Sequence, residues 1–513
     1  MQQRELSAGL ATARHRIIRR SIVPAAMALA IAALALYAYR NLLARPFAAD
    51  DYQWLVAVRG LGLGEVAGLA FDAGAQSHFY RPLVWLLFWA QGQAFGLDPR
   101  GYHVVSLALH LLNALLLGGL LYRLAGDGRR GTEDEAPTTR SSVYRLPAAL
   151  VAIAIVALHP APFEAVVWVS AQSELLAAAL LLLALHCWLN RAPAPGAPPA
   201  GVTLWAVLAT LALGLALLAK ESAVIGLPLL LLFSWGTHTP GAARRGVWRE
   251  LLPYTLPTLL TLAYIVLQIM VERRNYLLQA GGYGLGPQLL LNPLRSLALL
   301  LAPLTGTEHA DNAWLVPLGA LVAGLLLVAL GWALWQRERG GRRRLALLLA
   351  LGLTLAPTAP FASPPDSRYL YLPVIMGALW LAGMLGNAAQ LRMLAVRRSV
   401  AVGAWLLVLG CAALAWWAGG ELHLREWRFS AGAGPGGSLW QLATDVCVQS
   451  QPRQMLIVEP PLATPHAEAI VQLACGPDVR PVVLGRSQLD KAVGAHMVVI
   501  SFPNGSATIE RIT

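Results

Sequence analysis

The sequence predicts an all-α polytopic membrane protein that carries a small α/β domain at its carboxyl end. Hydrophobic residues make up 57% of the 513 residues and charged residues only 13%, whereas about a quarter of a soluble globular protein is charged. Apolar segments of roughly 17 to 25 residues, the length of a membrane span, also recur along the chain. Together these two observations exclude a soluble enzyme.

The net charge of +12 would point to nucleic acid in a soluble protein. Here the arginines gather in short loops between apolar segments, which is the pattern of the positive-inside rule. The basic amino terminus, residues 1–20, leads into an apolar run at 21–39 that we interpret as an uncleaved first span. We therefore expect a cytoplasmic amino terminus and no nucleic-acid partner.

If the chain crosses the membrane about eleven times, the dense basic loops fall on the same side as the amino terminus. The amino end is then inside and the carboxyl end outside. Two other apolar segments, 83–95 and 289–304, contain polar residues. Either one crossing alone would put later basic loops on the wrong side, so we predict both as interfacial helices on the outer face. Alternatively, both segments cross the membrane, and the loops after residue 304 then keep the same sides. The predicted spans are 21–39, 102–123, 146–160, 171–190, 202–219, 223–236, 251–270, 314–336, 345–361, 370–388 and 399–418.

The transmembrane domain is predicted at 21–418, and a small extracytoplasmic domain follows at 419–513. Apolar, β-branched segments in this tail predict buried strands, with a short helix between the first two. Cys447 and Cys475 would share an oxidising compartment there, either as a disulfide or as two free thiols. The predicted strands are 455–458, 481–484 and 497–501, and the helix is 467–474.

The first outer loop, residues 40–101, begins with two adjacent acids, Asp50 and Asp51. One isolated acid at a membrane boundary is commonly just solvated. Two adjacent carboxylates offer a general base beside a group that orients an acceptor hydroxyl or shifts its neighbour's pKa. The sequence therefore indicates acid/base chemistry at this loop.

The same loop contains His78, Tyr80 and Arg81. A guanidinium presents a planar fork of donors that matches phosphate oxygens, although interfacial arginines also commonly reach lipid headgroups. His103 and His110 lie seven residues apart on one helix face. They form either a metal pair or hydrogen bonds within the bundle.

Further polar groups fall on the same predicted outer face. Lys220 and Glu221 interrupt an apolar stretch, where charges are costly unless they are paired or functional. They either neutralise each other or leave Lys220 to bind phosphate. Because every such cluster lies on one side, we expect a single pocket. The remaining pocket candidates are His159, Glu164, Arg368 and Tyr369.

Other motifs are absent from the sequence. The glycine-rich segments 60–64 and 281–286 do not follow a strand and open a helix, so they are interpreted as flexible outer loops rather than dinucleotide fingerprints. No P-loop, HExxH or Cys/His zinc spacing occurs. We therefore predict no metal ligands and no certain cofactor, although paired acids are compatible with a divalent metal.

Several motifs, in this order and spacing, resemble the membrane-embedded glycosyltransferases of the GT-C superfamily. The greatest similarity is to the protein O-mannosyltransferase branch and its relatives with tetratricopeptide repeats. The matching residues are Asp50-Asp51, Tyr80-Arg81-Pro82, the run from Gly101-Tyr102-His103 to His110 and Asn113, His159-Pro160, Phe163 to Leu176, Ala219-Lys220-Glu221 and Arg368 to Pro373.

The resemblance implies that a sugar moves from a polyprenyl-phosphate donor to an acceptor hydroxyl at the outer face, with inversion. Asp50 or Asp51 would then be the catalytic base, and the lipid phosphate would contact Arg81, Lys220 and Arg368. It implies a multi-pass protein of a bacterial inner membrane whose site faces the periplasm or exterior. This chain has no repeat array after its last span and no large insertion at 271–313, which leaves the acceptor undefined.

Two other functions are alternatives. A transporter or flippase of a lipid-linked sugar would need polar residues in mid-span or a repeat between the two halves, and the sequence has neither. A non-catalytic membrane scaffold would leave the clustering of Asp50, Arg81, Lys220 and Arg368 on one face without an explanation.

Overall fold

A computed structural model describes most of the chain. The described residues are 26–75, 79–124, 142–191, 200–237, 247–273, 281–301, 313–335, 339–392, 434–489 and 496–512, together with residues 410, 413 and 417. The predicted span 399–418 therefore lies almost wholly outside the described residues, and so does His78.

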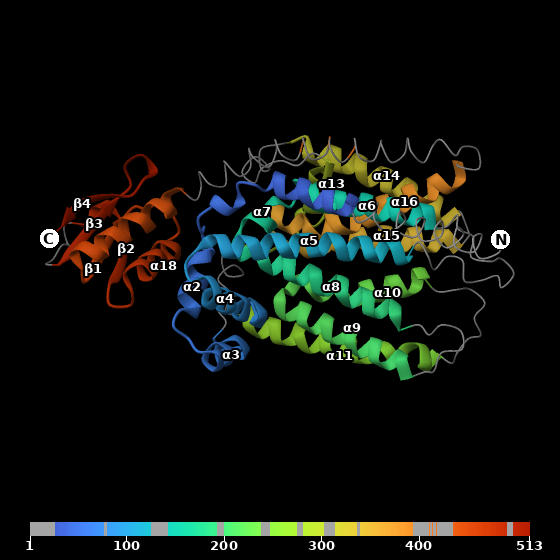
Figure 1. Ribbon diagram of the computed structural model, residues 1–513, viewed down its shortest axis with the longest axis horizontal. Helices are drawn as coiled ribbons and strands as arrows, with labels where there is room; N and C mark the ends of the chain where they lie inside the picture. Colours follow the sequence, from blue (N-terminus) through green and yellow to red (C-terminus); the bar gives the residue numbers. More distant parts are fainter. Residues whose placement is uncertain are drawn as a thin grey trace, which may run out of the picture.

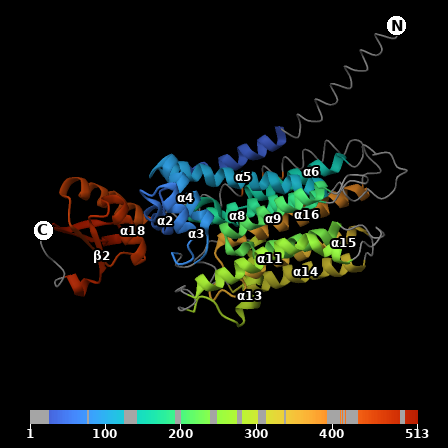
Figure 2. The same cartoon turned by 90° about the horizontal axis from the view of Figure 1, so that it is seen from below.

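Long apolar helices form a bundle in which they lie side by side (Figures 1 and 2). Leucine and alanine cover most sides of these helices, as expected of segments surrounded by lipid or by other helices. The helices of this bundle are Ala26–Ala44, α5 Pro99–Leu124, α6 Ser142–Leu158, α8 Gln172–Asn190, α9 Ala200–Ala219, α10 Gly226–Thr237, α11 Val247–Glu272, α13 Gln288–Leu301, α14 Leu315–Trp335, α15 Arg339–Leu355 and α16 Tyr371–Arg392.

Among the described residues, five helices are long and apolar enough to cross a membrane by length and composition. The chain is accordingly treated as an integral membrane protein. The number and direction of its crossings remain predictions. The five segments are Ala26–Ala44, Pro99–Leu124, Val169–Asn190, Leu251–Glu272 and Leu315–Trp335.

Polar side chains inside the bundle bind across helices. The Nδ2 of Asn113 on α5 donates to the Leu175 carbonyl of α8 at 2.9 Å and to the Tyr371 hydroxyl of α16 at 3.1 Å. His110, one turn earlier, has its Nδ1 3.0 Å from the same hydroxyl. Buried polar groups need such partners in an apolar interior. For His110 the structure therefore favours the hydrogen-bonding alternative over a metal pair.

Short helices gather at the end of the bundle nearest the carboxyl-terminal sheet, which we call the sheet end (Figure 1). The loop predicted at residues 60–64 is shorter than expected, because a helix begins at Leu63. The predicted interfacial segment at 83–95 is a helix, and its Gln91 is buried against Gln172. These helices are α2 Asp50–Val58, α3 Leu63–Phe71, α4 Pro82–Phe95 and α7 Phe163–Val167.

The tail folds into a four-stranded sheet with the order β2-β1-β3-β4. β1 pairs in parallel with β2 and β3, whereas β4 is antiparallel to β3. The three predicted strands and the helix are present, and the sequence did not predict β4 or the helix at 434–450. A disulfide joins Cys447 to Cys475. The elements are β1 Gln454–Val458, α18 Thr464–Cys475, β2 Arg480–Leu484, β3 Met497–Ser501 and β4 Thr508–Ile512.

Candidate functional site

The two adjacent acids begin α2 but lie in different environments. The side chain of Asp51 is buried, with 1% of its surface exposed. Its Oδ2 accepts a hydrogen bond from the Ala48 amide at 2.9 Å, and its Oδ1 accepts one from the Ser170 amide at 2.7 Å and one from the Ser170 hydroxyl. Asp51 thus fastens the start of α2 to the segment that precedes α8.

Burial raises the pKa of Asp51 to about 7, although the hydrogen bonds from Ser170 and Ala48 act in the opposite direction. A carboxyl group with a pKa near neutrality is suited to proton transfer. Ala49, which precedes the acid pair, has φ 48°, a left-handed conformation that is unfavourable for a residue with a Cβ. Strained backbone of this kind is often found at functional sites.

Asp50 faces the carboxyl-terminal domain. Its side chain is 46% exposed, and its Oδ1 lies 2.9 Å from the Nε2 of His466 on α18. The tail therefore contributes a side chain to the acid pair. Sequence reasoning did not identify His466, which is 416 residues away in the chain.

Arg368 lies in a short helix, Ser367–Leu370, that precedes α16. Its guanidinium pairs with Asp366 at 2.6 Å and with Glu164 at 3.4 Å, and its side chain is 22% exposed. It also lies over the rings of Trp168 and Tyr369, 4.9 and 4.8 Å from their centroids. Burial raises the pKa of Glu164, and the charge of Arg368 partly offsets that rise.

Arg81 and Glu221 form a bidentate ion pair. The Nε and Nη2 atoms of Arg81 lie 2.8 Å from the two carboxylate oxygens of Glu221. Although burial acts in the other direction, Arg81 lowers the pKa of Glu221 to about 2. Glu221 therefore forms its hydrogen-bonded ion pair with Arg81, and the charge of its neighbour Lys220 also lowers its pKa.

Lys220 instead pairs with Glu174 of α8 at 2.5 Å, and both side chains are buried, with 3% and 4% exposed. Its ammonium also lies 5.1 Å from the centroid of the Tyr369 ring. The ring of Tyr369 is therefore close to both Lys220 and Arg368. Three cations predicted from distant parts of the sequence consequently meet at the sheet end, together with four carboxylates.

Trp168 connects the acid pair to this cation cluster, which we define as Arg81, Lys220 and Arg368. Its Nε1 donates to the Ala48 carbonyl at 3.2 Å, and its ring lies against the Arg368 guanidinium. The Ala48 amide in turn donates to Asp51. Three contacts therefore link an acid from one part of the chain to a cation from another.

The other predicted pocket residues lie at the same end with less direct connections. The Tyr80 hydroxyl donates to the Phe71 carbonyl at 3.1 Å. The imidazole of His103 is within 3.2 Å of the Arg45 carbonyl, and that of His159 is 3.0 Å from the Leu300 carbonyl. All three of these contacts are made with backbone groups. Through these contacts the three residues brace the surrounding segments.

No group of three or more His, Cys, Asp or Glu side chains in the described part of the chain is arranged to hold a metal ion. The chemistry that can be derived from these residues is proton transfer by a carboxyl group and binding of an anion by arginines.

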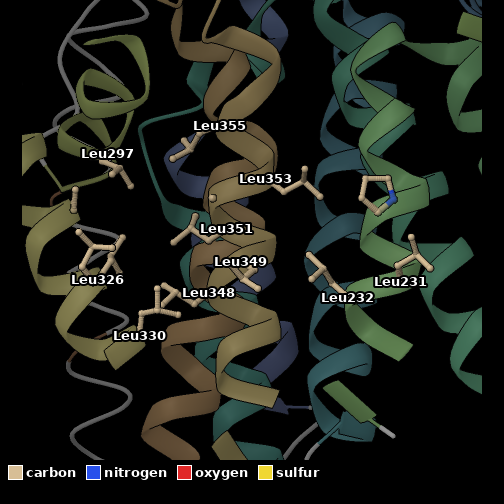
Figure 3. A pocket seen from close by; sticks show the side chains of 14 residues that line it. Leu231, Leu232, Leu297, Leu326, Leu330, Leu348, Leu349, Leu351, Leu353 and Leu355 are labelled. Carbon is tan, nitrogen blue, oxygen red and sulfur yellow. The ribbon is translucent and has the colours of Figure 1, made fainter. Parts of the chain in front are cut away.

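A cavity of about 700 Å³ lies between α10, α13, α14 and α15. Figure 3 shows leucines from these helices along it, among them Leu232, Leu326 and Leu355. Every described residue that lines it is apolar, so the cavity suits a hydrocarbon chain and not a reacting centre. α15 ends at Leu355, and a few residues later Phe361 packs its ring against Tyr369, with centroids 4.9 Å apart.

Comparison with known proteins identifies the fold. The crystal structure of ArnT from Cupriavidus metallidurans bound to undecaprenyl phosphate has a TM-score of 0.51, with 94% of this chain and 93% of that chain covered at 14% sequence identity. The apo state of the same protein gives a TM-score of 0.50 at 16% identity, with 95% and 94% covered. This chain has the ArnT fold. The resemblance to GT-C enzymes predicted from the sequence is thereby confirmed at the level of the fold.

A curated relative supports the O-mannosyltransferase likeness over a short segment. Protein O-mannosyl-transferase Tmtc3 of Drosophila melanogaster is 35% identical over 128 residues, which are 24% of this chain and 14% of that protein. The chain thus spans about a seventh of the length of this relative. No protein-family model matches the sequence.

Proposed function

We propose that this protein is a glycosyltransferase that moves a sugar from a polyprenyl-phosphate donor to an acceptor hydroxyl. The observation that carries the proposal is the contact chain from Asp51 through Ala48 and Trp168 to Arg368. It joins the carboxyl group of Asp51, which can take up a proton, to the guanidinium of Arg368, which can bind an anion, in a protein with the ArnT fold. ArnT has been crystallised with undecaprenyl phosphate.

In the proposed reaction the acceptor oxygen attacks the anomeric carbon of the sugar, and the bond from that carbon to the phosphate oxygen breaks. The acceptor proton passes to the acid pair, and the lipid leaves as a phosphate monoester with one additional negative charge. Attack opposite the leaving phosphate inverts the anomeric configuration. Stabilising the developing phosphate charge is the natural task of nearby cations.

The side chains of Asp50 and Asp51 differ in solvent exposure, which indicates different roles for the two acids. Asp50 is 46% exposed and can meet an acceptor. Asp51 is buried, and its two oxygens hold Ala48 and Ser170. We therefore propose that Asp50 contacts the acceptor hydroxyl. Asp51 would hold the loop in place and share the proton that the acceptor releases.

The exposures also distinguish the three cations. Arg368 and Arg81 are 22% and 16% exposed, so a lipid phosphate can reach them. Lys220 is buried with Glu174, and its ammonium lies 5.1 Å from the centroid of the Tyr369 ring. Since four carboxylates already surround three cations, an incoming phosphate must displace an acid. Glu164, whose pKa is raised by burial, is the acid best suited to take up a proton at that moment.

The apolar cavity would receive the polyprenyl chain of the donor. It reaches Leu355 at the end of α15, and the ring contact between Phe361 and Tyr369 connects the following segment to the cation cluster. A donor entering sideways from the bilayer could thus place its chain among leucines and its phosphate beside Arg368.

We place the sheet end outside the cytoplasm. The disulfide between Cys447 and Cys475 is typical of an oxidising compartment. Arginines lie at the opposite end of the bundle, as the positive-inside rule expects of the cytoplasmic side. These include Arg123 at the end of α5, Arg191 after α8, and Arg342 near the start of α15.

A transfer assay tests this function. The purified protein in liposomes receives undecaprenyl phosphate carrying radiolabelled mannose, and native membranes from cells without the gene supply acceptors. We expect label to leave the lipid fraction and enter a product with the wild type, and the rate to fall sharply with Asp50→Asn. Equal rates with both proteins would remove the catalytic assignment. Retention of label on every polyprenyl-phospho-sugar tested would remove the function.

A further inference from the structure

Helix α18 of the carboxyl-terminal domain lies alongside α2, the helix that begins with the acid pair (Figures 1 and 2). At one end, Asp50 meets His466 in the first turn of α18. At the other end, Arg59, which follows α2, donates to the Leu473 carbonyl in the last turn of α18 at 2.5 Å. The two helices therefore run side by side in the same direction.

At both ends of α18, the charge of the contacting side chain favours docking of this helix against α2. A helix carries partial positive charge at its amino end and partial negative charge at its carboxyl end. The carboxylate of Asp50 lies at the amino end of α18, and the guanidinium of Arg59 lies at its carboxyl end. The bundle thus presents an anion and a cation that complement the dipole of a helix from another part of the chain.

Apolar packing fixes α18 in this position. Tyr52 and Leu55 of α2 share one continuous core with Ile470 of α18. Tyr52 also contacts the ring of Trp440, with centroids 6.2 Å apart. The disulfide at Cys475 ties the last residue of α18 to the helix that contains Trp440. The domain is therefore packed onto the acid-bearing helix through its own core.

The contact between His466 and Asp50 contributes little to that docking. The two side chains are 21% and 46% exposed, and partly exposed ion pairs add little to stability. The imidazole does fix one oxygen of the carboxylate at the residue assigned to the acceptor. A contact that orients a reacting group matters more for rate than for folding.

Building on the proposed function, we propose that His466 is a positioning residue of the transferase site and that the carboxyl-terminal domain completes this site. The imidazole nitrogen holds Oδ1 of Asp50 and leaves the second carboxylate oxygen to the acceptor hydroxyl. The site is then assembled from two parts of the chain, the helix bundle and the tail.

Three variants test the proposal in the full-length protein with undecaprenyl-phosphomannose as the donor. His466→Ala removes the contact, and we expect turnover to fall about ten- to a hundredfold with the donor KM unchanged. His466→Gln keeps an N–H close to the position of Nε2 and should recover part of the turnover. Arg59→Gln is the matched control, because it removes the polar contact at the other end of α18 without touching Asp50, and it should keep wild-type turnover.

Thermal unfolding of each variant shows whether the domain stays folded. Wild-type turnover in His466→Ala would overturn the inference while leaving the proposed function intact. An equal loss in Arg59→Gln would also overturn it, because docking alone would then account for the effect. Absence of transfer by the wild type would instead refute the proposed function, so the two failures are distinguishable.

Discussion

The acid pair and the cation cluster lie at the same end of the molecule but are held in different ways. The acids draw hydrogen-bond donors from separate elements, Ser170 for Asp51 and His466 for Asp50. Each cation already has a carboxylate partner. In the proposed reaction the acid pair can therefore act as it stands, whereas the cluster must exchange a partner before it can bind an anion.

Asp50→Asn tests the acid pair and should have the largest effect of these substitutions on turnover. An amide cannot take up the acceptor proton, and loss of a general base costs roughly a hundred- to ten-thousandfold in turnover. Asp98→Asn is the control, because Asp98 is an exposed acid in the same connection between the first two predicted spans. Turnover measured with labelled donor should fall only in Asp50→Asn. A comparable loss in the control would show that the assay reports general damage to the loop.

Lys220→Met tests the cluster through its buried member. Glu174 would keep its charge without a partner, and breaking a buried pair costs about 3 to 5 kcal/mol of stability. Arg486→Gln breaks the exposed pair with Glu510, whose side chains are 58% and 31% exposed, and should cost about 1 kcal/mol or less. Thermal unfolding in detergent measures both. Similar losses would mean that Lys220 is not buried as described.

Arg368→Ala tests the accessible member of the cluster. Hydrogen bonds to charged groups are worth roughly 1.5 to 3 kcal/mol, so we expect the donor KM to rise about ten- to a hundredfold. Folding should be retained, because the Arg368 side chain is partly exposed. Arg100→Ala is the control, because Arg100 is an exposed arginine in the connection between the first two predicted spans. An unchanged KM in Arg368→Ala would exclude it from phosphate binding.

The smallest expected effect is a pH dependence of stability that arises from Asp51. Its pKa is about 7 in the folded protein, against 3.8 for an unperturbed aspartic acid, so folding takes up a proton between these values and stability falls as pH rises through 7. From pH 6 to pH 8 this loss is about 1 kcal/mol. Thermal unfolding of the wild type should show the loss, and Asp51→Asn should lack it. The same slope in both proteins would assign it to other groups, such as Glu164.

The sequence predicted the fold class, most of the helices and the connecting segments that carry the polar residues. Hydrophobic length and composition determine these features, and both can be read locally. Three of the four strands in the tail were likewise predicted from apolar, β-branched segments. β4 was not, because all five of its residues are exposed and give no apolar alternation.

The sequence could not predict which charged groups pair. Lys220 and Glu221 are adjacent, yet their partners are Glu174 and Arg81, which lie elsewhere in the chain. His466 gave no signal at all, since its role depends on how α18 docks against α2. Such pairings are set by tertiary packing, and spacing in the sequence does not encode them.

The most direct measurement is an electron cryo-microscopy structure of the full-length protein in nanodiscs with undecaprenyl phosphate. Our account predicts phosphate density within hydrogen-bonding distance of Arg368 or Arg81 at the sheet end, with the lipid chain entering the apolar cavity at Leu355. The acid pair should line the same space. Phosphate density at the opposite end of the bundle, or separated from Asp50 by packed protein, would contradict it.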